Sequence, residues 1–214
     1  MCIEKPMDCI GALFARHRSE KVIPEQVSNI IASLAKSEPQ PFVVKEEKYL
    51  LTPCNAIPYI EVFNLYKSLF RDQDVRRFLY ETTPYAFVEI ALFVDLLYKS
   101  VSRLRFAISN EYSDESNNTQ RCGQVSISLE LDENGELTVS LGIVIMKEYW
   151  NRGIGEDALT AIFNILKGAG VKTVSATVHL DNAGSNRLFE KVFGLPAGFN
   201  EQDPQNAYLY SKKL

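Results

Sequence analysis

The sequence predicts an α+β fold built around one main β-sheet, and three features of its pattern lead to this prediction. Segments with strand and helix patterns follow in mixed order: strand, two helices, three strands, helix, strand, helix and a final strand. Two alternating runs joined by Asn134-Gly135 indicate an antiparallel hairpin. A strand–helix–strand unit at residues 137–180 indicates a parallel pair, so the sheet is expected to be mixed.

The composition is that of an ordinary globular protein. The chain has 214 residues, of which 46% are hydrophobic and 23% charged, enough for one large domain or a domain with an extension. A net charge of −4 disfavours general nucleic-acid binding. No apolar run reaches the roughly 18 residues that span a bilayer, and the N-terminus lacks a secretory pattern. We therefore expect neither a membrane span nor a signal peptide.

The cysteines and histidines are few and scattered. The cysteines are Cys2, Cys9, Cys54 and Cys122, and the two histidines are His17 and His179. None of them forms a C-x-x-C pair or a tight cluster, so neither a zinc site nor any other metal site is expected. Four cysteines in a chain of this size are typical of reduced thiols in a cytoplasmic protein.

Residues 1–47 have the pattern of a helical N-terminal extension, followed by the main domain at residues 48–214. Ile10, Leu13 and Phe14 have helical spacing. After Pro24, a second stripe follows the helical period: Val27, Ile30, Ile31 and Leu34. The prolines in 37–41 break this helix and predict a linker. We expect the stripe to pack on the main body; a lid or a dimer contact is the alternative, and the protein is expected to be a monomer or a homodimer.

The first half of the main domain begins with a strand at 48–54. Residues 56–80 have a helical pattern with a break near Gln73-Asp74, and Thr83-Pro84 opens a second helix that runs to about residue 101. Residues 103–111 alternate weakly and predict a strand. The polar segment 113–120 has no apolar anchor and predicts a mobile loop.

The second half contains the hairpin strands, two helices and two further strands. The hairpin strands are predicted at 125–131 and 137–141. A helix with Leu159, Ile162, Phe163 and Leu166 on one face ends at the glycines of 168–170. A strand follows at 171–180. Asp181-Asn182 then caps a helix at 183–193, and a last strand is predicted at 208–212.

The most informative segment is 141–156, where an apolar run ends at a glycine turn before a helix. The turn reads Arg152-Gly153-Ile154-Gly155. Free N–H groups converge at a helix N-terminus, the helix dipole adds positive charge there, and glycine lets the backbone approach a phosphate. A Rossmann turn would need a third glycine where Ala158 stands, and no P-loop is present. A plain helix start is the alternative to a pyrophosphate site at 150–156.

Two motifs resemble the GNAT superfamily of acetyl-CoA-dependent N-acyltransferases, in particular the branch with the ribosomal-protein N-terminal acetyltransferases. The first is the pyrophosphate turn Tyr149-Trp150-Asn151-Arg152-Gly153-Ile154-Gly155. The second is the helix motif Asn182-Ala183-Gly184-Ser185-Asn186-Arg187-Leu188-Phe189-Glu190-Lys191. The resemblance covers residues 48–214 and implies a GNAT-like fold, a mostly antiparallel mixed sheet flanked by helices.

The resemblance also implies a binding mode for acetyl-CoA. The backbone of 142–145, with Ile143, Val144 and Ile145, would pair with the pantetheine arm between splayed strands at 137–146 and 171–180. The pyrophosphate would be held by amides of the turn: Trp150, Asn151, Arg152, Gly153, Ile154 and Gly155. Asn182 and Ser185 would lie on the cofactor side of the last helix. Simpler roles are an N-cap for Asn182, a solvated charge for Arg187 and local packing for Trp150.

Acetylation of an amine by a thioester sets chemical requirements that the sequence meets only in part. The amine must lose a proton; an α-amine with a pKa of about 8 needs less help than a lysine at about 10.4. A main-chain N–H near 143–145 is the candidate donor for the oxyanion. The family's tyrosine acid is replaced by Phe189, which leaves Ser185 as the nearest hydroxyl. A glutamate common in this branch is replaced by Ser140.

The general base is therefore open among Glu130, Glu148, His179 and a water relay. Cys122 is not expected to carry the acyl group, because no histidine neighbours it in the sequence and the family transfers directly.

These observations predict transfer of an acetyl group from acetyl-CoA to a primary amine by direct attack in a ternary complex. The amine could belong to a protein N-terminus, a polyamine, an amino acid or an aminoglycoside, and residues 56–101 would read it. Because the acid and base positions depart from the family pattern, a catalytically weak or inactive acyl-CoA sensor or scaffold is the main alternative. A domain that binds another nucleotide is a further one.

Overall fold

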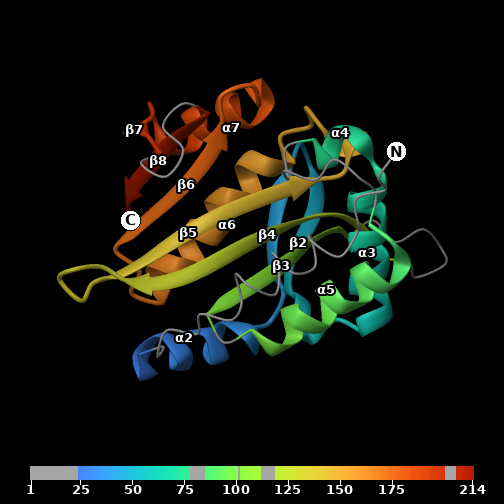
Figure 1. Cartoon of the computed structure of the whole chain (residues 1–214), viewed down its shortest axis with the longest axis horizontal. Coiled ribbons are helices and arrows are strands. Elements are labelled where there is room, and N and C mark those ends of the chain that lie inside the picture. Colours follow the sequence, from blue (N-terminus) through green and yellow to red (C-terminus); the bar gives the residue numbers. More distant parts are fainter. Residues whose placement is uncertain (1–23, 78–84, 101, 112–118, 201–205) are drawn as a thin grey trace, which may run out of the picture.

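The computed structural model describes residues 24–77, 85–100, 102–111, 119–200 and 206–214, and within these ranges it has one sheet and six α-helices (Figure 1). The strands are β1 (Gln40–Val44), β2 (Glu47–Pro53), β3 (Arg103–Asn110), β4 (Gln120–Leu131), β5 (Leu137–Ile145), β6 (Thr173–His179), β7 (Gly198–Phe199) and β8 (Ala207–Lys213). The helices are α2 (Glu25–Ala35), α3 (Tyr59–Arg71), α4 (Gln73–Arg76), α5 (Phe87–Lys99), α6 (Ile154–Gly168) and α7 (Ala183–Phe193), with 3₁₀ turns η1 (Cys54–Ala56) and η2 (Lys147–Tyr149).

The sheet is mixed, as predicted. Its order is β1-β2-β3-β4-β5-β6-β8-β7, and β5–β6 is the parallel pair among antiparallel neighbours. The hairpin turn forms at Asn134-Gly135, where Gly135 has a φ of 76° and Asp132 Oδ1 accepts from the Asn134 and Glu136 amides. The predicted α+β class, with a mostly antiparallel sheet flanked by helices, is confirmed.

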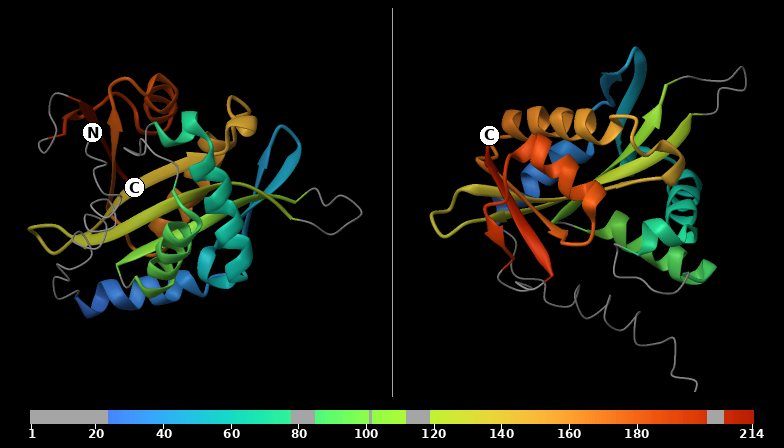
Figure 2. Two further views of the ribbon diagram at one scale, coloured as in Figure 1. Left: turned by 45° about the vertical axis from the view of Figure 1, so that its right-hand side comes forward. Right: turned by 90° about the horizontal axis from the view of Figure 1, so that it is seen from above.

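Helices cover both faces of the sheet (Figure 2). On one face, α2, α6 and α7 bury their apolar sides against alternating residues of the central strands, such as Ile127 and Val139. On the other face, α3 and α5 form a second cluster that includes Ala107 of β3 and contacts Val144 of β5. The sheet is thereby held from both sides, which fixes the positions of its strand ends.

The segment expected as the N-terminal extension contributes to the sheet and core. The stripe of α2 is buried through Val27, Ile31 and Leu34, as packing on the main body requires. Residues 40–44 form strand β1 and pair with β2, although Gln40-Pro41 were expected to belong to the linker at 37–41. This strand could not be predicted from the sequence, because its five residues start with Gln40-Pro41. Residues 1–23 lie outside the described ranges, and the division at residue 47 stays a prediction.

The remaining helix boundaries shift by a few residues. The long helix predicted at 56–80 breaks at Asp72, whose Oδ1 caps α4 by accepting from the Asp74 and Val75 amides. The second helix begins at Phe87 instead of Thr83, and the Glu89 carboxylate accepts the Ala86 N–H at its start. Thr83-Pro84 and the predicted loop residues 113–118 lie outside the described ranges.

Candidate acyl-CoA site

The central feature of the site is a split between β5 and β6. These strands pair only through Thr138–Ser140 and Thr173–Ser175. Beyond this point β5 continues against β4 to Ile145, and β6 continues against β8 to His179, so the two strands diverge (Figure 1). The structure therefore has the splay that the resemblance implied for strands 137–146 and 171–180.

Hydrogen bonds at both ends of β5 show which of its backbone groups face the split. The Met146 amide donates to Cys122 of β4 (2.8 Å), whereas the Leu137 carbonyl accepts from Lys172 on the β6 side (2.9 Å). Because the edges alternate along a strand, even-numbered residues bond to β4 and odd-numbered residues face β6. Past Ser140, the backbone groups of Leu141, Ile143 and Ile145 therefore face the opening.

Two residues whose backbone was predicted to pair with the pantetheine arm use backbone groups within the protein instead. The Val144 N–H and C=O belong to the β4 pairing, and its side chain packs against the α3–α5 cluster. The Ile145 carbonyl accepts the Trp150 indole N–H at 2.7 Å. Along this edge, Ile143 and the Ile145 amide are the groups best placed among the three predicted residues to meet a ligand.

The glycine turn between η2 and α6 presents a run of free amides. Within the described part of the chain, no acceptor is found for the N–H groups of residues 151–155, and α6 has no side-chain cap. The Trp150 amide, by contrast, donates to Lys147 (3.1 Å). Asn151 and Gly153 take positive φ values of 60° and 94°, which turn these amides outward. Five successive donors at the start of a 15-residue helix form a strong anion-binding arrangement.

Charged side chains around the turn suit an anion. The Arg152 guanidinium lies over the Tyr149 ring, 5.2 Å from its centroid, and Arg152 is exposed. Glu156, in the first turn of α6, would repel a phosphate, but Lys191 of α7 pairs with it at 3.2 Å. Burial, followed by the Glu156 charge, raises the pKa of Asp157. The ion pair with Lys191 reduces the negative charge close to the free amides.

The start of α7 lies at the end of β6 and is anchored to it. The Asn182 side chain accepts the Ser185 N–H (3.1 Å) and so caps the helix, which is the N-cap role considered for it from the sequence. Ser185 is half-buried, and its hydroxyl has no hydrogen-bond partner among the described residues. Arg187 is exposed, whereas Phe189 is buried against Phe193 and Tyr210. The position of the family's tyrosine acid therefore belongs to the core.

Asn186 is the functional residue of this helix that the sequence reasoning missed. Its side chain is buried, donates to the carbonyls of His179 (3.0 Å) and Leu180 (3.1 Å), and accepts the Tyr210 hydroxyl (3.0 Å). These bonds fix α7 to the end of β6 and to β8. The sequence signal that could have indicated this role is an asparagine on the inner face of an amphipathic helix.

His179 lies at the end of β6, half-buried, with Ser175 and Thr177 on its face of the strand. Its Nδ1 accepts the Asp181 amide at 3.1 Å. In the neutral ring this bond assigns the proton to Nε2, because a nitrogen that accepts a hydrogen bond carries no proton. The geometry therefore does not favour His179 as a proton acceptor.

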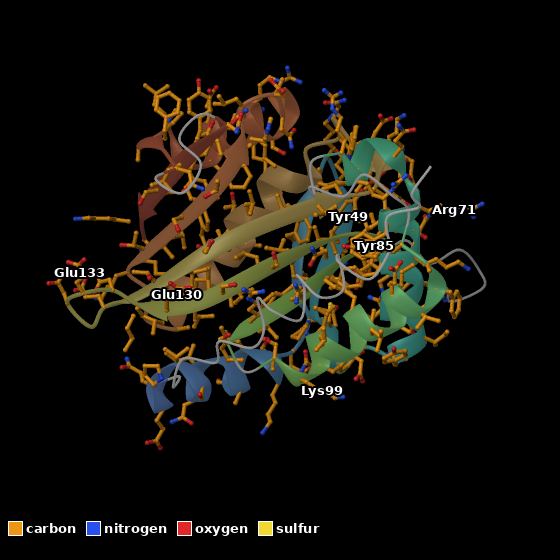
Figure 3. The ribbon with its side chains drawn as sticks, in the orientation of Figure 1. Tyr49, Arg71, Tyr85, Lys99, Glu130 and Glu133 are labelled. Carbon is orange, nitrogen blue, oxygen red and sulfur yellow. The ribbon has the colours of Figure 1, made fainter. Side chains whose placement is uncertain are left out.

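The two candidate glutamates lie apart from the split. Glu130 pairs with Thr138, in the closed part of the sheet near the hairpin that carries Glu133 (Figure 3). Glu148 is exposed in η2, just before the glycine turn. The structure therefore brings residues 143–145, the turn and the start of α7 to one end of the sheet, with Glu148 beside the turn and Glu130 at the opposite end.

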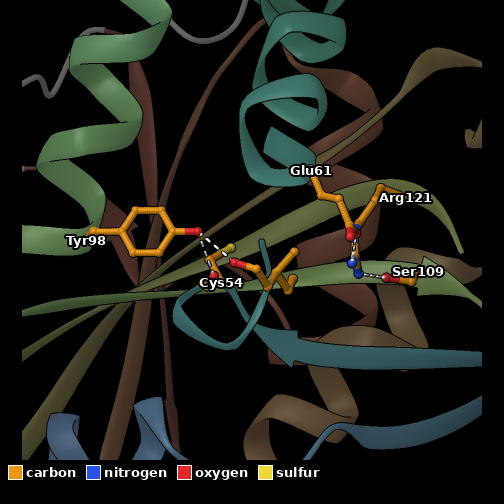
Figure 4. Close-up of polar contacts among 6 residues, drawn as sticks. Cys54, Glu61, Tyr98, Ser109 and Arg121 are labelled. Carbon is orange, nitrogen blue, oxygen red and sulfur yellow. Dashed lines mark hydrogen bonds and ion pairs between the residues drawn. The ribbon is translucent and has the colours of Figure 1, made fainter. Parts of the chain in front are cut away.

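Hydrogen bonds and an ion pair hold α3 and α5 over the other face of the sheet (Figure 4). The Tyr98 hydroxyl of α5 donates to the carbonyls of Cys54 (3.2 Å) and Ile57 (2.9 Å). Arg121 of β4 donates to Ser109 and pairs with Glu61 of α3. These contacts hold α3 and α5, two helices of the predicted acceptor-reading segment 56–101, as a fixed layer over the sheet.

Both described cysteines are expected to be unreactive in the folded protein. Burial raises the pKa of Cys54 to about 11 and that of Cys122 to about 12, and the Cys122 Sγ donates to the Ile108 carbonyl. Iodoacetamide at pH 8, followed by peptide mapping, should label neither site until the protein is denatured. Rapid labelling of Cys122 in the native protein, together with loss of acetyl transfer in Cys122→Ala, would contradict this expectation and would indicate that Cys122 carries the acyl group.

Neither a metal site nor a membrane-spanning helix is found in the described part of the chain. No group of three or more histidine, cysteine, aspartate or glutamate side chains is arranged to hold a metal ion. Among the described helices, none is both long and apolar enough to cross a bilayer.

A family model described as "Acetyltransferase (GNAT) domain" matches residues 60–192, which is more than half of the chain. The match includes the split strands, the glycine turn and α7 up to Val192. No significant match is found among curated proteins.

Solved structures share the fold at low sequence identity. A GNAT-family acetyltransferase from Bacillus anthracis is 16% identical with a TM-score of 0.63, covering 81% of this chain and 98% of its own. RimL, a ribosomal L7/L12 α-N-protein acetyltransferase in an apo form, is 14% identical (TM-score 0.64; 83% and 96%). Mycobacterium smegmatis RimJ in complex with CoA-disulfide is also 14% identical (TM-score 0.67; 84% and 88%).

Proposed function

The chain belongs to the GNAT acetyltransferase family, and we propose that it transfers an acetyl group from acetyl-CoA to a primary amine by direct attack in a ternary complex. Its fold is the GNAT fold expected from the sequence. The observation that carries the proposal is the run of five free amides at the start of α6, next to the split between β5 and β6.

In the proposed complex, the diphosphate of CoA accepts hydrogen bonds from the amides of residues 151–155, with Arg152 adding positive charge. The pantetheine arm enters the split and pairs with the exposed edge of β5 at Ile143. That a RimJ structure holds CoA-disulfide on the same fold supports this choice of cofactor over another nucleotide. Trp150 would position the end of β5 through its bond to the Ile145 carbonyl.

The acyl transfer itself needs few groups from the protein. A free amine attacks the thioester carbonyl, and the resulting oxyanion accepts a hydrogen bond from an amide at the edge of β5, either Ile143 or Ile145. The C–S bond then breaks, the new amide nitrogen loses a proton, and the CoA thiolate takes one up; Ser185, at the start of α7, is the candidate relay that gives its proton to the thiolate and regains one from the nitrogen. An α-amine titrates near pH 8, so water can accept its proton at neutral pH. His179 is proposed to line the acceptor side of the split, and Glu148 remains the alternative base beside the turn.

The experiment combines a binding and a turnover measurement. Trp150 is the single tryptophan of the chain, is 39% exposed and adjoins the free amides, so CoA should change its fluorescence in a saturable titration. A thiol-release assay would then test peptide N-termini, a polyamine, an amino acid and an aminoglycoside. Binding with thiol release supports the proposal. Binding without release for any amine favours the sensor or scaffold, and absence of binding would contradict the CoA site.

A further inference from the structure

Arg105 of β3 places a positive charge between the sheet and the α3–α5 layer without a negative partner. It is half-buried, and its guanidinium carbon lies 5.4 Å from the centroid of the Phe93 ring of α5. Among the described residues, no carboxylate lies within ion-pair distance of it, whereas Arg121 on the neighbouring strand pairs with Glu61. A half-buried cation loses part of its hydration, so an anionic ligand at this point would be favoured.

The register of the sheet places Arg105 in line with the opening of the split. Arg105 pairs with Ser126, and Ser126 pairs with Gly142. Gly142 lies two residues beyond Ser140, where the pairing of β5 with β6 ends. Residues paired in this way project to the same face, and two strand spacings separate the Arg105 and Gly142 backbones by about 10 Å. An extended arginine side chain covers a large part of that distance.

The groups around Arg105 leave its charge uncompensated. The Tyr66 hydroxyl donates to Gln124 Oε1 at 3.1 Å, so these two buried side chains satisfy each other. Burial raises the pKa of Tyr66, whereas the charge of Arg105 and a hydrogen bond with it act against this shift, so Tyr66 stays neutral at neutral pH and adds no negative charge. The Phe93 ring offers a cation–π contact but no negative charge.

We propose that the acceptor of this enzyme carries a carboxylate close to its reactive amine, and that Arg105 binds this carboxylate. The inference rests on the proposed acetyl transfer and narrows its substrate class. With its amine at the edge of β5 and its carboxylate over β3, the acceptor would extend across Ser126, which pairs with both Arg105 and Gly142. A polyamine would instead bring a second positive charge toward Arg105. The carboxylate could come from a free amino acid or from an acidic residue near a peptide N-terminus.

The test uses acceptors matched in shape and differing in charge. Peptides Ala-Asp-Ala and Ala-Asn-Ala, both amidated at the C-terminus, examine the peptide source. Alanine and alaninamide examine the free amino acid. We expect the acidic member of at least one pair to have the higher kcat/KM, and the pair that shows this identifies the source. Spermidine is expected to be a poorer acceptor than either acid.

Variants then assign the preference to Arg105. Arg105→Gln should raise KM for the preferred acid about tenfold or more and leave its neutral partner within about twofold, because a charge-assisted hydrogen bond is lost only with the acid. Arg105→Lys keeps the charge and should restore part of the affinity. Arg103→Gln, an exposed arginine on the same strand and face, should leave both acceptors unchanged.

The outcomes separate this inference from the proposed function. Equal effects of Arg105→Gln on acid and neutral acceptors, or a preference for neutral amines or spermidine in the native enzyme, would overturn the role of Arg105 while leaving acetyl transfer intact. Absence of thiol release with every amine would overturn both. A CoA titration of Arg105→Gln that matches the native protein shows that the fold and the cofactor site are unchanged in the variant.

Discussion

Replacement of Gly153 by glutamate is expected to abolish CoA binding, with an affinity at least about 100-fold lower, equivalent to about 2.8 kcal/mol. Gly153 has a φ of 94° and supplies one of the five free amides at the start of α6. A glutamate there places a negative charge and a side chain where the diphosphate is proposed to lie. A fluorescence titration of Trp150 with CoA measures the change.

The matched control is Gly135→Glu in the hairpin between β4 and β5. Gly135 also has a positive φ (76°), and a Cβ there would meet no atom within 4 Å. A glutamate at either position carries the same charge and a backbone strain of about 1–2 kcal/mol. The hairpin variant should therefore lose similar stability and keep full CoA affinity. If both variants bind CoA as the native protein does, the diphosphate does not use the turn.

The second large effect is expected from Asn186→Ala, which should lower the free energy of unfolding by about 3 kcal/mol. The change removes a buried acceptor from Tyr210 and takes the Asn186 amide donor from the carbonyls of His179 and Leu180, although the His179 carbonyl keeps the Asn182 N–H. For a chain of this length, the thermal midpoint should fall by about 6–12 °C, which calorimetry would measure.

Two variants separate this network from a general helix effect. Tyr210→Phe removes one of the three hydrogen bonds and should cost about 1–2 kcal/mol. Asn164→Ala replaces an exposed asparagine within α6 and should change stability by less than about 0.5 kcal/mol. Because Asn186 also holds the start of α7 beside β6, its variant should lose acetyl transfer along with stability. A thermal midpoint within 2 °C of the native value would show that the network is not needed.

The parts of the structure that the sequence predicts well are those coded locally. The hairpin follows from Asn134-Gly135, and α7 spans 183–193 as expected because Asn182 supplies its cap. The glycine turn before α6 could also be predicted, since Gly153 and Gly155 stand between an apolar strand and a helix. In each case a few neighbouring residues determine the backbone geometry.

The parts that escape sequence reasoning depend on contacts between distant segments. The β4 pairing of Val144 depends on the alternation set along β5, and the Trp150 contact to the Ile145 carbonyl on how η2 folds back. Strand β1 is stabilised by β2 and by the core under it, which its short, proline-containing sequence does not reveal. The proposed role of Arg105 depends on the strand register that places it in line with Ser126 and Gly142, which the sequence alone does not show.

The most direct test of the account is a crystal structure of the protein with CoA. We expect the diphosphate oxygens within about 2.7–3.2 Å of backbone nitrogens among residues 151–155, with the pantetheine arm between β5 and β6 beside Ile143. A diphosphate bound elsewhere, with the five amides of the turn still without a ligand, would contradict the proposed site and the mechanism built on it.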